Sequence, residues 1–337
     1  MYYMPMLLII LIVLALLYSF LNGIHDSSNI VATMISSRAI RPQLALLLTA
    51  VAVFCGPYVF GVKVADTIGN EIVTSEHINM MVLIAALVSA IAWNVVTWIL
   101  GIPSSSSHAL IGGILGAVAM KAGFAVLNIA GLGKILIFLF ISPFFGFFAG
   151  WLFANIVRLL CWKATPRANE LFKKMQIFTA LGPALGMGSN DAPKSMGIIA
   201  LGLMISGITT QFTVFPWVIL VSALAISIGT AIGGWSLIKT LCSKFYKIRP
   251  IHGFSAQASA AVVVLFSSLL GGPVSTTQVV SSAIMGVGAA ERFSKVRWHV
   301  AGEIASAWLF TIPATGLLAA GIYWVLTKGV PALINIF

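Results

Sequence analysis

The chain has 337 residues, of which 60% are hydrophobic and only 8% are charged. A soluble protein of this length could not cover its surface with so few charged side chains, so the composition excludes an ordinary soluble domain. The formal net charge of +11 comes from basic residues in short loops without an aromatic platform, which argues against nucleic-acid binding.

Long apolar stretches follow one another along the chain, each near the roughly 20 residues that a helix needs to cross a bilayer. In chain order, we expect membrane-spanning helices near residues 5–35, 43–62, 79–100, 135–157, 175–200, 213–235, 254–270 and 299–327. Two shorter apolar segments, near 103–120 and 273–288, are rich in Gly, Ser and Thr. Because long unalternating runs exclude a β-barrel, the sequence predicts an all-α polytopic membrane protein with about ten membrane segments.

The loops between these segments differ in charge. If the N-terminus lies outside and each segment crosses once, most loop lysines and arginines fall inside. Only Lys63, Lys121, Lys134 and Lys328 then fall outside. Cytoplasmic loops of membrane proteins carry an excess of Lys and Arg. We therefore predict a multi-pass protein of the cell (cytoplasmic) membrane with both termini outside.

An internal repeat divides the chain into two halves. Gly101–Gly116 recurs as Gly271–Gly286, with identical Gly, Pro and Ser residues at corresponding positions, and Asn22–Asn29 recurs at nearly the same spacing as Met187–Lys194. On the predicted topology the first half begins outside and the second begins inside, so the repeats are inverted. The predicted parts are a first repeat at 1–157, a basic cytoplasmic linker at 158–174 and a second repeat at 175–337.

Gly-Pro followed by hydroxyl residues is typical of a broken membrane helix. Proline fits the first helical turn, and the N–H groups and hydroxyls that follow point to the same place. Inverted-repeat transporters bind their substrate near the midplane at such breaks. We therefore predict an anion between the two breaks, bound by Ser105, Ser106, Ser107, Ser275, Thr276 and Thr277. The alternative is that these small residues only allow close helix packing.

Few ionisable side chains remain inside the predicted membrane segments. Asp26 and Asp191 occupy equivalent positions of the two halves and should approach one another across the pseudo-twofold axis. Carboxylates at this depth need counter-charge, which a transported cation supplies. Sodium prefers hard oxygen ligands, so we predict Na⁺ at both carboxylates, with amide oxygens from Asn22, Asn29 and Asn190 beside it.

Four further residues at membrane depth each keep two interpretations. Lys194 stands where the first half has an Asn, so its ammonium either fills a cation site beside Asp191 or pairs with the bound anion. Glu303 is either a cation ligand or an interhelical hydrogen-bond partner. His25 and His108 are either proton carriers or neutral side chains that satisfy buried hydrogen bonds.

Segments in the same order over almost the whole chain resemble the inorganic phosphate transporter (PiT) family, bacterial type. They are Asn22–Arg38, Trp93–Gly116, Gly188–Gly197 and Pro273–Gly302. The duplicated Asn-Asp signature of the family looks like His25-Asp26 and Asn190-Asp191 here. The resemblance implies symport of phosphate with Na⁺ or H⁺ by an inverted-repeat carrier without another cofactor, and it suggests a homodimer.

The resemblance also assigns site residues. For phosphate it adds Asp26, Asn190 and Asp191 to the hydroxyl residues of the two breaks. For the coupling cation, the position and chemistry of the residues at membrane depth predict Asn22, Asp26, Asn29, Asp191, Lys194 and Glu303. Pro193 and Gln278 depart from the Gln and His that are commoner in the family.

Other functions fit the same residues less well. Hydrogen phosphate can donate a proton to a carboxylate and sulfate cannot, so Asp26 and Asp191 favour phosphate over a sulfate permease of the same fold. The paired carboxylates would also repel an anion in an open channel. An intramembrane hydrolase using one of the Ser residues with His108 is disfavoured. Ser107 and His108 are neighbours and would point in different directions on a helix, and no hydrolase motif is present. We expect a transporter, not an enzyme.

Overall fold

The computed structural model of the chain describes residues 3–71, 78–102, 104–163, 168–244 and 249–329. Its α-helices are α1 (Tyr3–Ser36), α2 (Pro42–Phe60), α3 (Lys63–Asn70), α4 (Met80–Leu100), α5 (Ser106–Ala122), α6 (Ile129–Leu160), α7 (Ala168–Ile205), α8 (Pro216–Ile232), α9 (Trp235–Lys244), α10 (Pro250–Leu269), α11 (Thr276–Glu291) and α12 (Trp298–Trp324). Short 3-10 turns follow α5 and α11 at Phe124–Val126 and Phe293–Lys295, and a π-helical turn, Val325–Gly329, follows α12. No strand occurs in these described ranges, and the predicted all-α class is confirmed.

Six of the described helical segments are long and apolar enough to cross a membrane. They are Met4–Ser36, Pro42–Phe60, Met80–Leu100, Ile129–Leu160, Pro250–Leu269 and Ala301–Lys328. The predicted spans near 175–200 and 213–235 correspond to α7, which carries the polar motif around Asp191, and to α8, which has only 17 residues. The larger total of about ten membrane segments remains a prediction.

Two helical hairpins, α4–α5 and α10–α11, coincide with the repeated sequence motif. The first helix of each hairpin ends at a glycine with positive φ, 66° at Gly101 and 73° at Gly271, a conformation that glycine adopts without strain. The N–H of the next residue bonds back to a carbonyl of the last turn, at 2.9 Å in the first hairpin and 2.8 Å in the second. The matched glycines of the sequence are therefore matched helix ends.

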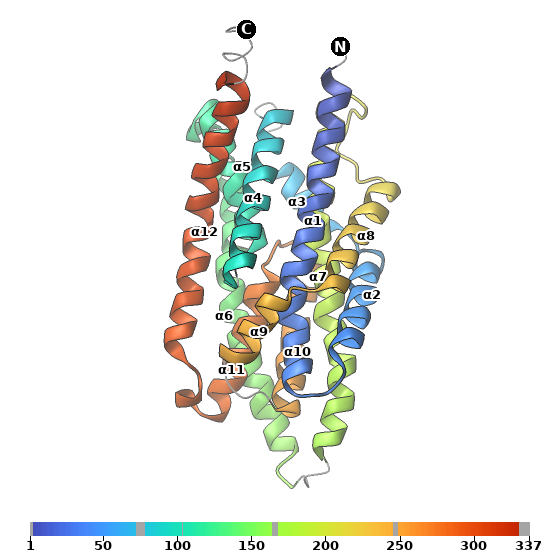
Figure 1. The fold of residues 1–337 in the computed structure, drawn as a ribbon, viewed down its shortest axis with the longest axis vertical. Helices are drawn as coiled ribbons and strands as arrows, with labels where there is room; N and C mark the ends of the chain where they lie inside the picture. Colours follow the sequence, from blue (N-terminus) through green and yellow to red (C-terminus); the bar gives the residue numbers. More distant parts are fainter. Residues whose placement is uncertain (1–2, 72–77, 103, 164–167, 245–248, 330–337) are drawn as a thin grey trace.

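The second helix of each hairpin begins at a capping serine. The Ser105 hydroxyl accepts from the His108 N–H at 3.2 Å, and the Ser275 hydroxyl accepts from the Gln278 N–H at 3.4 Å. The N-termini of α5 and α11, which are the positive ends of their helix dipoles, thus lie at the hairpin tips. Figure 1 shows α4 descending from the end where both chain termini lie and α10 rising from the opposite end.

Helices of the two halves cross at glycines. α1 packs against α8 and α7 against α2, while α5 packs against α12 and α11 against α6. A Cβ on Gly23 would lie 2.1 Å from the Ile226 carbonyl oxygen, and a Cβ on Gly188 would lie 2.0 Å from the Val53 carbonyl oxygen. Because these neighbours are backbone atoms, they cannot turn aside for a larger residue. The crossings hold the polar motifs of α1 and α7 at the hairpin tips.

Two short helices, α3 and α9, lie where the sequence predicts loops. α3 acts as a strap on the second hairpin, because Lys63 Nζ donates to the Leu269 carbonyl at 3.1 Å and the Thr67 hydroxyl donates to the Gly271 carbonyl at 2.7 Å. These bonds satisfy carbonyls left open where α10 ends. The strap therefore fixes the tip of the second hairpin.

Candidate functional site

The two hairpin tips meet the two carboxylates that the sequence places at the centre of the site. Asp26 on α1 is 2% exposed and Asp191 on α7 is fully buried. Asp26 accepts hydrogen bonds from the hydroxyl of Thr277 and, at 3.2 Å, from that of Ser106. The Thr276 hydroxyl lies 2.7 Å from Asp191 and 3.4 Å from Asp26, so one hydroxyl proton serves two carboxylates. α5 and α11 thus contact the same acidic pair.

Lys194 lies on α7 one turn after Asp191 and is 1% exposed. Its Nζ donates to Asp191 at 2.5 Å, to the Ser107 hydroxyl at 2.5 Å and to the Val274 carbonyl at 2.9 Å. An ammonium group has three N–H donors, and all three are used here. This geometry favours the interpretation in which the lysine fills a cation position beside Asp191. The same side chain also joins the two hairpin tips.

Asn190 and Asn29, predicted as ligands, are engaged with the second hairpin. The Asn190 amide nitrogen donates to the Gly272 carbonyl at 3.0 Å, and its Oδ1 accepts from the Val274 N–H at 3.0 Å. The Asn29 amide nitrogen donates to the Thr277 hydroxyl at 3.2 Å, and that hydroxyl in turn donates to a carboxylate. In this conformation both asparagines position the hairpin tip.

Ser105 and Ser275, also predicted to bind the anion, cap their helices as described above. The Ser105 hydroxyl additionally lies 2.7 Å from His108 Nδ1. Capping commits these oxygens to backbone N–H groups of their own hairpins. The hydroxyls that reach the charged centre are therefore those of the next two residues in each hairpin.

Next to Asp26 on α1, and on the helix that contacts it, several buried polar atoms have no hydrogen-bond partner. Asn22 on α1 and Asn94 on α4 have both amide atoms open, although neither residue is more than 1% exposed. His25 Nδ1 is also open, whereas its Nε2 lies 3.4 Å from the Thr97 hydroxyl. Each unsatisfied buried polar atom costs about 1–3 kcal/mol, so these atoms call for a partner such as water, an ion or a polar ligand.

Asn94 belongs to this set although the sequence argument did not select it. α1 and α4 pack against each other and run in the same direction in Figure 1. Asn94 precedes Thr97 by about one turn, as Asn22 precedes His25, so the two amides lie at the same level. The sequence could have identified Asn94 by its amide, which stands inside the apolar stretch 79–100, because polar groups at membrane depth are costly.

The structure does not bring Glu303 to this centre. Its side chain is exposed near the start of α12, so its position does not support the predicted role as a cation ligand beside the two Asp residues. In the described part of the chain, no group of three or more His, Cys, Asp or Glu side chains could hold a metal ion. A cation at Asp26 or Asp191 would therefore need hydroxyl and amide oxygens as further ligands.

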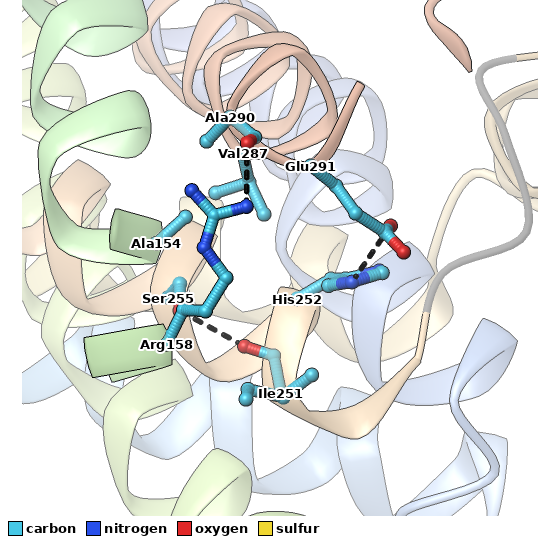
Figure 2. Close-up of a pocket in the computed structure, with 8 residues that line it drawn as sticks. All are labelled: Ala154, Arg158, Ile251, His252, Ser255, Val287, Ala290 and Glu291. Carbon is cyan, nitrogen blue, oxygen red and sulfur yellow. Dashed lines mark hydrogen bonds and ion pairs between the residues drawn. The ribbon is translucent and has the colours of Figure 1, made fainter. Parts of the chain in front are cut away.

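A pocket of about 130 Å³ lies at the base of the second hairpin between α6, α10 and α11 (Figure 2). Arg158 donates to the Ala290 carbonyl at 2.9 Å, near the C-terminal end of α11. His252 Nε2 lies 3.2 Å from the Glu291 carboxylate, which ties the start of α10 to the end of α11. These side chains bind one another and the backbone, so their contacts hold the base of the second hairpin in place.

Comparison with known proteins gives concordant matches. Residues 22–319 match the model of a family described as the phosphate transporter family. The chain is 44% identical over 320 residues to a probable low-affinity inorganic phosphate transporter of Rhizobium meliloti, which covers 94% of this chain and 96% of the relative. A Bacillus subtilis protein with the same description is 42% identical over 325 residues, 95% of this chain and 97% of the relative. A solved structure named "The sodium-dependent phosphate transporter" has the same fold, with a TM-score of 0.88 at 24% identity over 95% of this chain and 99% of that one.

Proposed function

This chain belongs to the phosphate transporter family, and from that membership we propose that it carries inorganic phosphate across the cytoplasmic membrane together with a coupling cation. It is a transporter and not an enzyme. The observation that carries the proposal is the meeting of two helix N-termini, those of α5 and α11, at two buried carboxylates.

We place phosphate between the two hairpin tips. Helix N-termini bind anions through their N–H groups, and the four tip hydroxyls add further donors. These hydroxyls now donate to protein acceptors and would turn to the phosphate oxygens. Asp26 and Asp191 would accept the proton of hydrogen phosphate, which sulfate does not have, and this difference favours phosphate over sulfate.

The charge of the site explains why a cation accompanies the anion. Two carboxylates and one ammonium are buried together, so the site carries a net charge of about −1 before phosphate adds more. Buried charge of one sign is unfavourable unless it is paired. The Lys194 ammonium already neutralises the Asp191 carboxylate, so the cation position still to be filled is at Asp26. Cation and phosphate would then favour each other's binding to the same extent.

The hydrogen bonds around His25 favour a proton as this cation. The Thr97 hydroxyl donates to the Trp93 carbonyl at 2.9 Å, so His25 Nε2 must be the donor in its own contact with that hydroxyl. Nδ1 of the neutral ring then turns a lone pair toward Asp26 Oδ1, 3.6 Å away. A proton on Nδ1 would convert this repulsion into an ion pair. Sodium held by Asp26 and Asn22 is the alternative.

We further propose alternating access by two inverted repeats, 1–157 and 175–337, joined by the basic linker 158–174. The opposite directions of the two hairpins in Figure 1 support this, as do the paired glycine crossings of α1 with α8 and α7 with α2. The end of α6 and the start of α7, which flank the linker, lie opposite the start of α1 and the end of α12 in Figure 1. The positive-inside rule then assigns the linker to the cytoplasm and both termini to the outside.

Uptake of radiolabelled phosphate by proteoliposomes tests the proposal. We expect accumulation against a concentration gradient when a proton gradient is imposed, and no competition from excess sulfate. Asp26→Ala should abolish accumulation in a protein that still folds. Uptake that never exceeds equilibrium would instead indicate a channel, and strong sulfate competition would indicate a sulfate permease.

The coupling ion is tested by His25→Asn, with His299→Asn on the exposed start of α12 as the matched control. His25→Asn should lose proton-driven accumulation but still exchange internal for external phosphate, while His299→Asn should accumulate phosphate like the wild type. Accumulation driven by a sodium gradient and unaffected by His25→Asn would assign the coupling role to sodium.

A further inference from the structure

Three pockets of similar size open between helices on surfaces rich in exposed apolar side chains. One of about 480 Å³ lies between α6, α11 and α12, one of about 550 Å³ between α6 and α10, and one of about 550 Å³ between α5 and α12. Volumes in this range suit small-molecule ligands. The three pockets differ in the chemistry of their walls, and that difference separates the first from the others.

The pocket between α6, α11 and α12, named the aromatic pocket here, has walls made mainly of rings. They are Phe140, Phe144, Phe147 and Phe148 from α6 and Trp298 and Trp308 from α12. Phe144 and Phe148 are 65% and 64% exposed, so the opening faces the predicted lipid side. Aromatic rings gain additional energy by packing on other rings. The walls therefore favour a flat aromatic ligand that dissolves in the bilayer.

The floor of the aromatic pocket is polar because Gln278, the third residue of α11, lines it. Gln278 is 1% exposed, and its Oε1 has no hydrogen-bond partner. His108 on α5 contacts the Phe140 ring edge to face, with ring centroids 5.4 Å apart. His108 is fully buried, and its Nε2 also has no partner. Gln278 Oε1 is therefore an unsatisfied buried acceptor in the lining of the aromatic pocket.

Neighbouring hydrogen bonds assign the proton of His108. The Gln278 amide nitrogen, which can only donate, lies 3.5 Å from His108 Nδ1, and the Ser105 hydroxyl lies 2.7 Å from the same nitrogen. Nδ1 is therefore the acceptor, and the neutral ring carries its proton on Nε2. Because the Gln278 amide nitrogen is directed at His108 Nδ1, the lining of the pocket offers one unused acceptor, Gln278 Oε1.

The other two pockets lack this feature. The α5–α12 pocket is lined by glycines and apolar side chains. In the α6–α10 pocket, Ser142 and Ser267 donate to carbonyls of their own helices at 3.2 Å and 2.8 Å. A lipid acyl chain would fit these two pockets as well as an aromatic compound would. The aromatic pocket differs by its open acceptor, Gln278 Oε1.

We propose that the aromatic pocket binds a membrane-soluble aromatic compound that carries a hydroxyl group, of the phenol or hydroquinone class. The ring packs among the Phe and Trp side chains, and the hydroxyl donates to Gln278 Oε1. A neutral head group suits this depth because a charged one is costly inside the bilayer. Gln278 directly follows Thr277, which donates to Asp26, so the ligand contacts the helical turn that forms the anion site.

Contact quenching of tryptophan fluorescence by a ring-brominated octylphenol tests the proposal in the full chain, held in phosphatidylcholine nanodiscs. Trp308→Phe identifies the part of the pocket signal that comes from Trp308, the more buried of its two tryptophans. The methyl ether of the same compound lacks the donated hydrogen. We expect saturable quenching by the phenol, with the ether binding about tenfold more weakly.

Variants separate the pocket from general contact with lipid. Ala305→Phe fills the aromatic pocket from α12 and should abolish saturable quenching, whereas Ala320→Phe, on the same helix in the α5–α12 pocket, should leave it unchanged. Gln278→Leu should remove the preference for the phenol over the ether. Phenol and ether binding equally to the wild type, or Ala305→Phe binding the phenol normally, would overturn the proposal. Cross-linking of Ala305→Cys between two copies would also overturn it, because a second copy would then cover the pocket.

Discussion

Lys194→Asn removes the one buried ammonium of the site and tests how its charge is balanced. The wild-type side chain bonds Asp191, Ser107 and Val274 and so joins the two hairpins. Removing one partner of a buried ion pair costs about 3–5 kcal/mol, because the other charge stays buried and unpaired. We expect the variant to unfold at a clearly lower temperature than the wild type in sodium-free buffer at neutral pH.

A cation that takes the place of the ammonium should reverse this loss. Binding at a concentration a hundredfold above Kd restores about 2.7 kcal/mol. The stability of Lys194→Asn should therefore rise with sodium concentration, or rise as the pH falls because protonation of Asp191 removes the unpaired charge. The variant should also move one more positive charge per phosphate than the wild type.

Thermal unfolding followed by intrinsic fluorescence, across sodium and pH titrations, measures the first effect. Currents compared with radiolabelled uptake in proteoliposomes measure the second. The control is a double variant, Lys194→Met with Asp191→Asn, which removes both charges and should recover stability without any cation dependence. A Lys194→Asn protein that is as stable as the wild type under all these conditions, with the same charge per phosphate, would refute the reasoning.

Three further substitutions test other parts of the site. Thr276→Val should weaken equilibrium phosphate binding by about 1–3 kcal/mol and Thr276→Ser should recover it; equal affinities would make the hydroxyl a packing group. Thr67→Val removes the 2.7 Å hydrogen bond to the second hairpin and should raise KM for uptake about fivefold. Thr67→Ser keeps the hydroxyl and is the control. An unchanged KM in Thr67→Val would contradict this role. Glu303→Gln, at an exposed position, should leave the cation dependence of uptake as in the wild type; a changed dependence would return Glu303 to the site.

The local features of the fold could be predicted because short segments of the sequence determine them. Apolar length predicts the long helices, and the repeated Gly-Pro-Ser/Thr motif predicts two helix breaks. The motif also predicts that hydroxyls and carboxylates meet, since Asp26 and Asp191 recur at matching places. In the structure Thr276 lies within hydrogen-bonding distance of both.

Features that depend on contacts between distant segments could not be predicted. α3 is a short amphipathic helix. Its structural role depends on two hydrogen bonds to the second hairpin, which is more than 200 residues away in the sequence. Sequence reasoning also could not decide that Asn190 and Asn29 would position the hairpin tip, because the amide of an Asn serves a ligand or a backbone equally well. Asn94 was missed for the same reason, since its importance depends on the helix facing it.

The glycine crossings bear on how this protein tolerates mutation. Besides Gly23 and Gly188, a Cβ on Gly229 would lie 1.9 Å from the Phe20 carbonyl oxygen, and one on Gly56 would lie 2.4 Å from that of Leu185. Each crossing is therefore sensitive from both of its helices. A fold made by duplication is often regarded as having spare copies of its parts. Here duplication has the opposite effect. A Cβ added at any one of these four glycines would push two helices apart, and an intact crossing elsewhere cannot replace the damaged one.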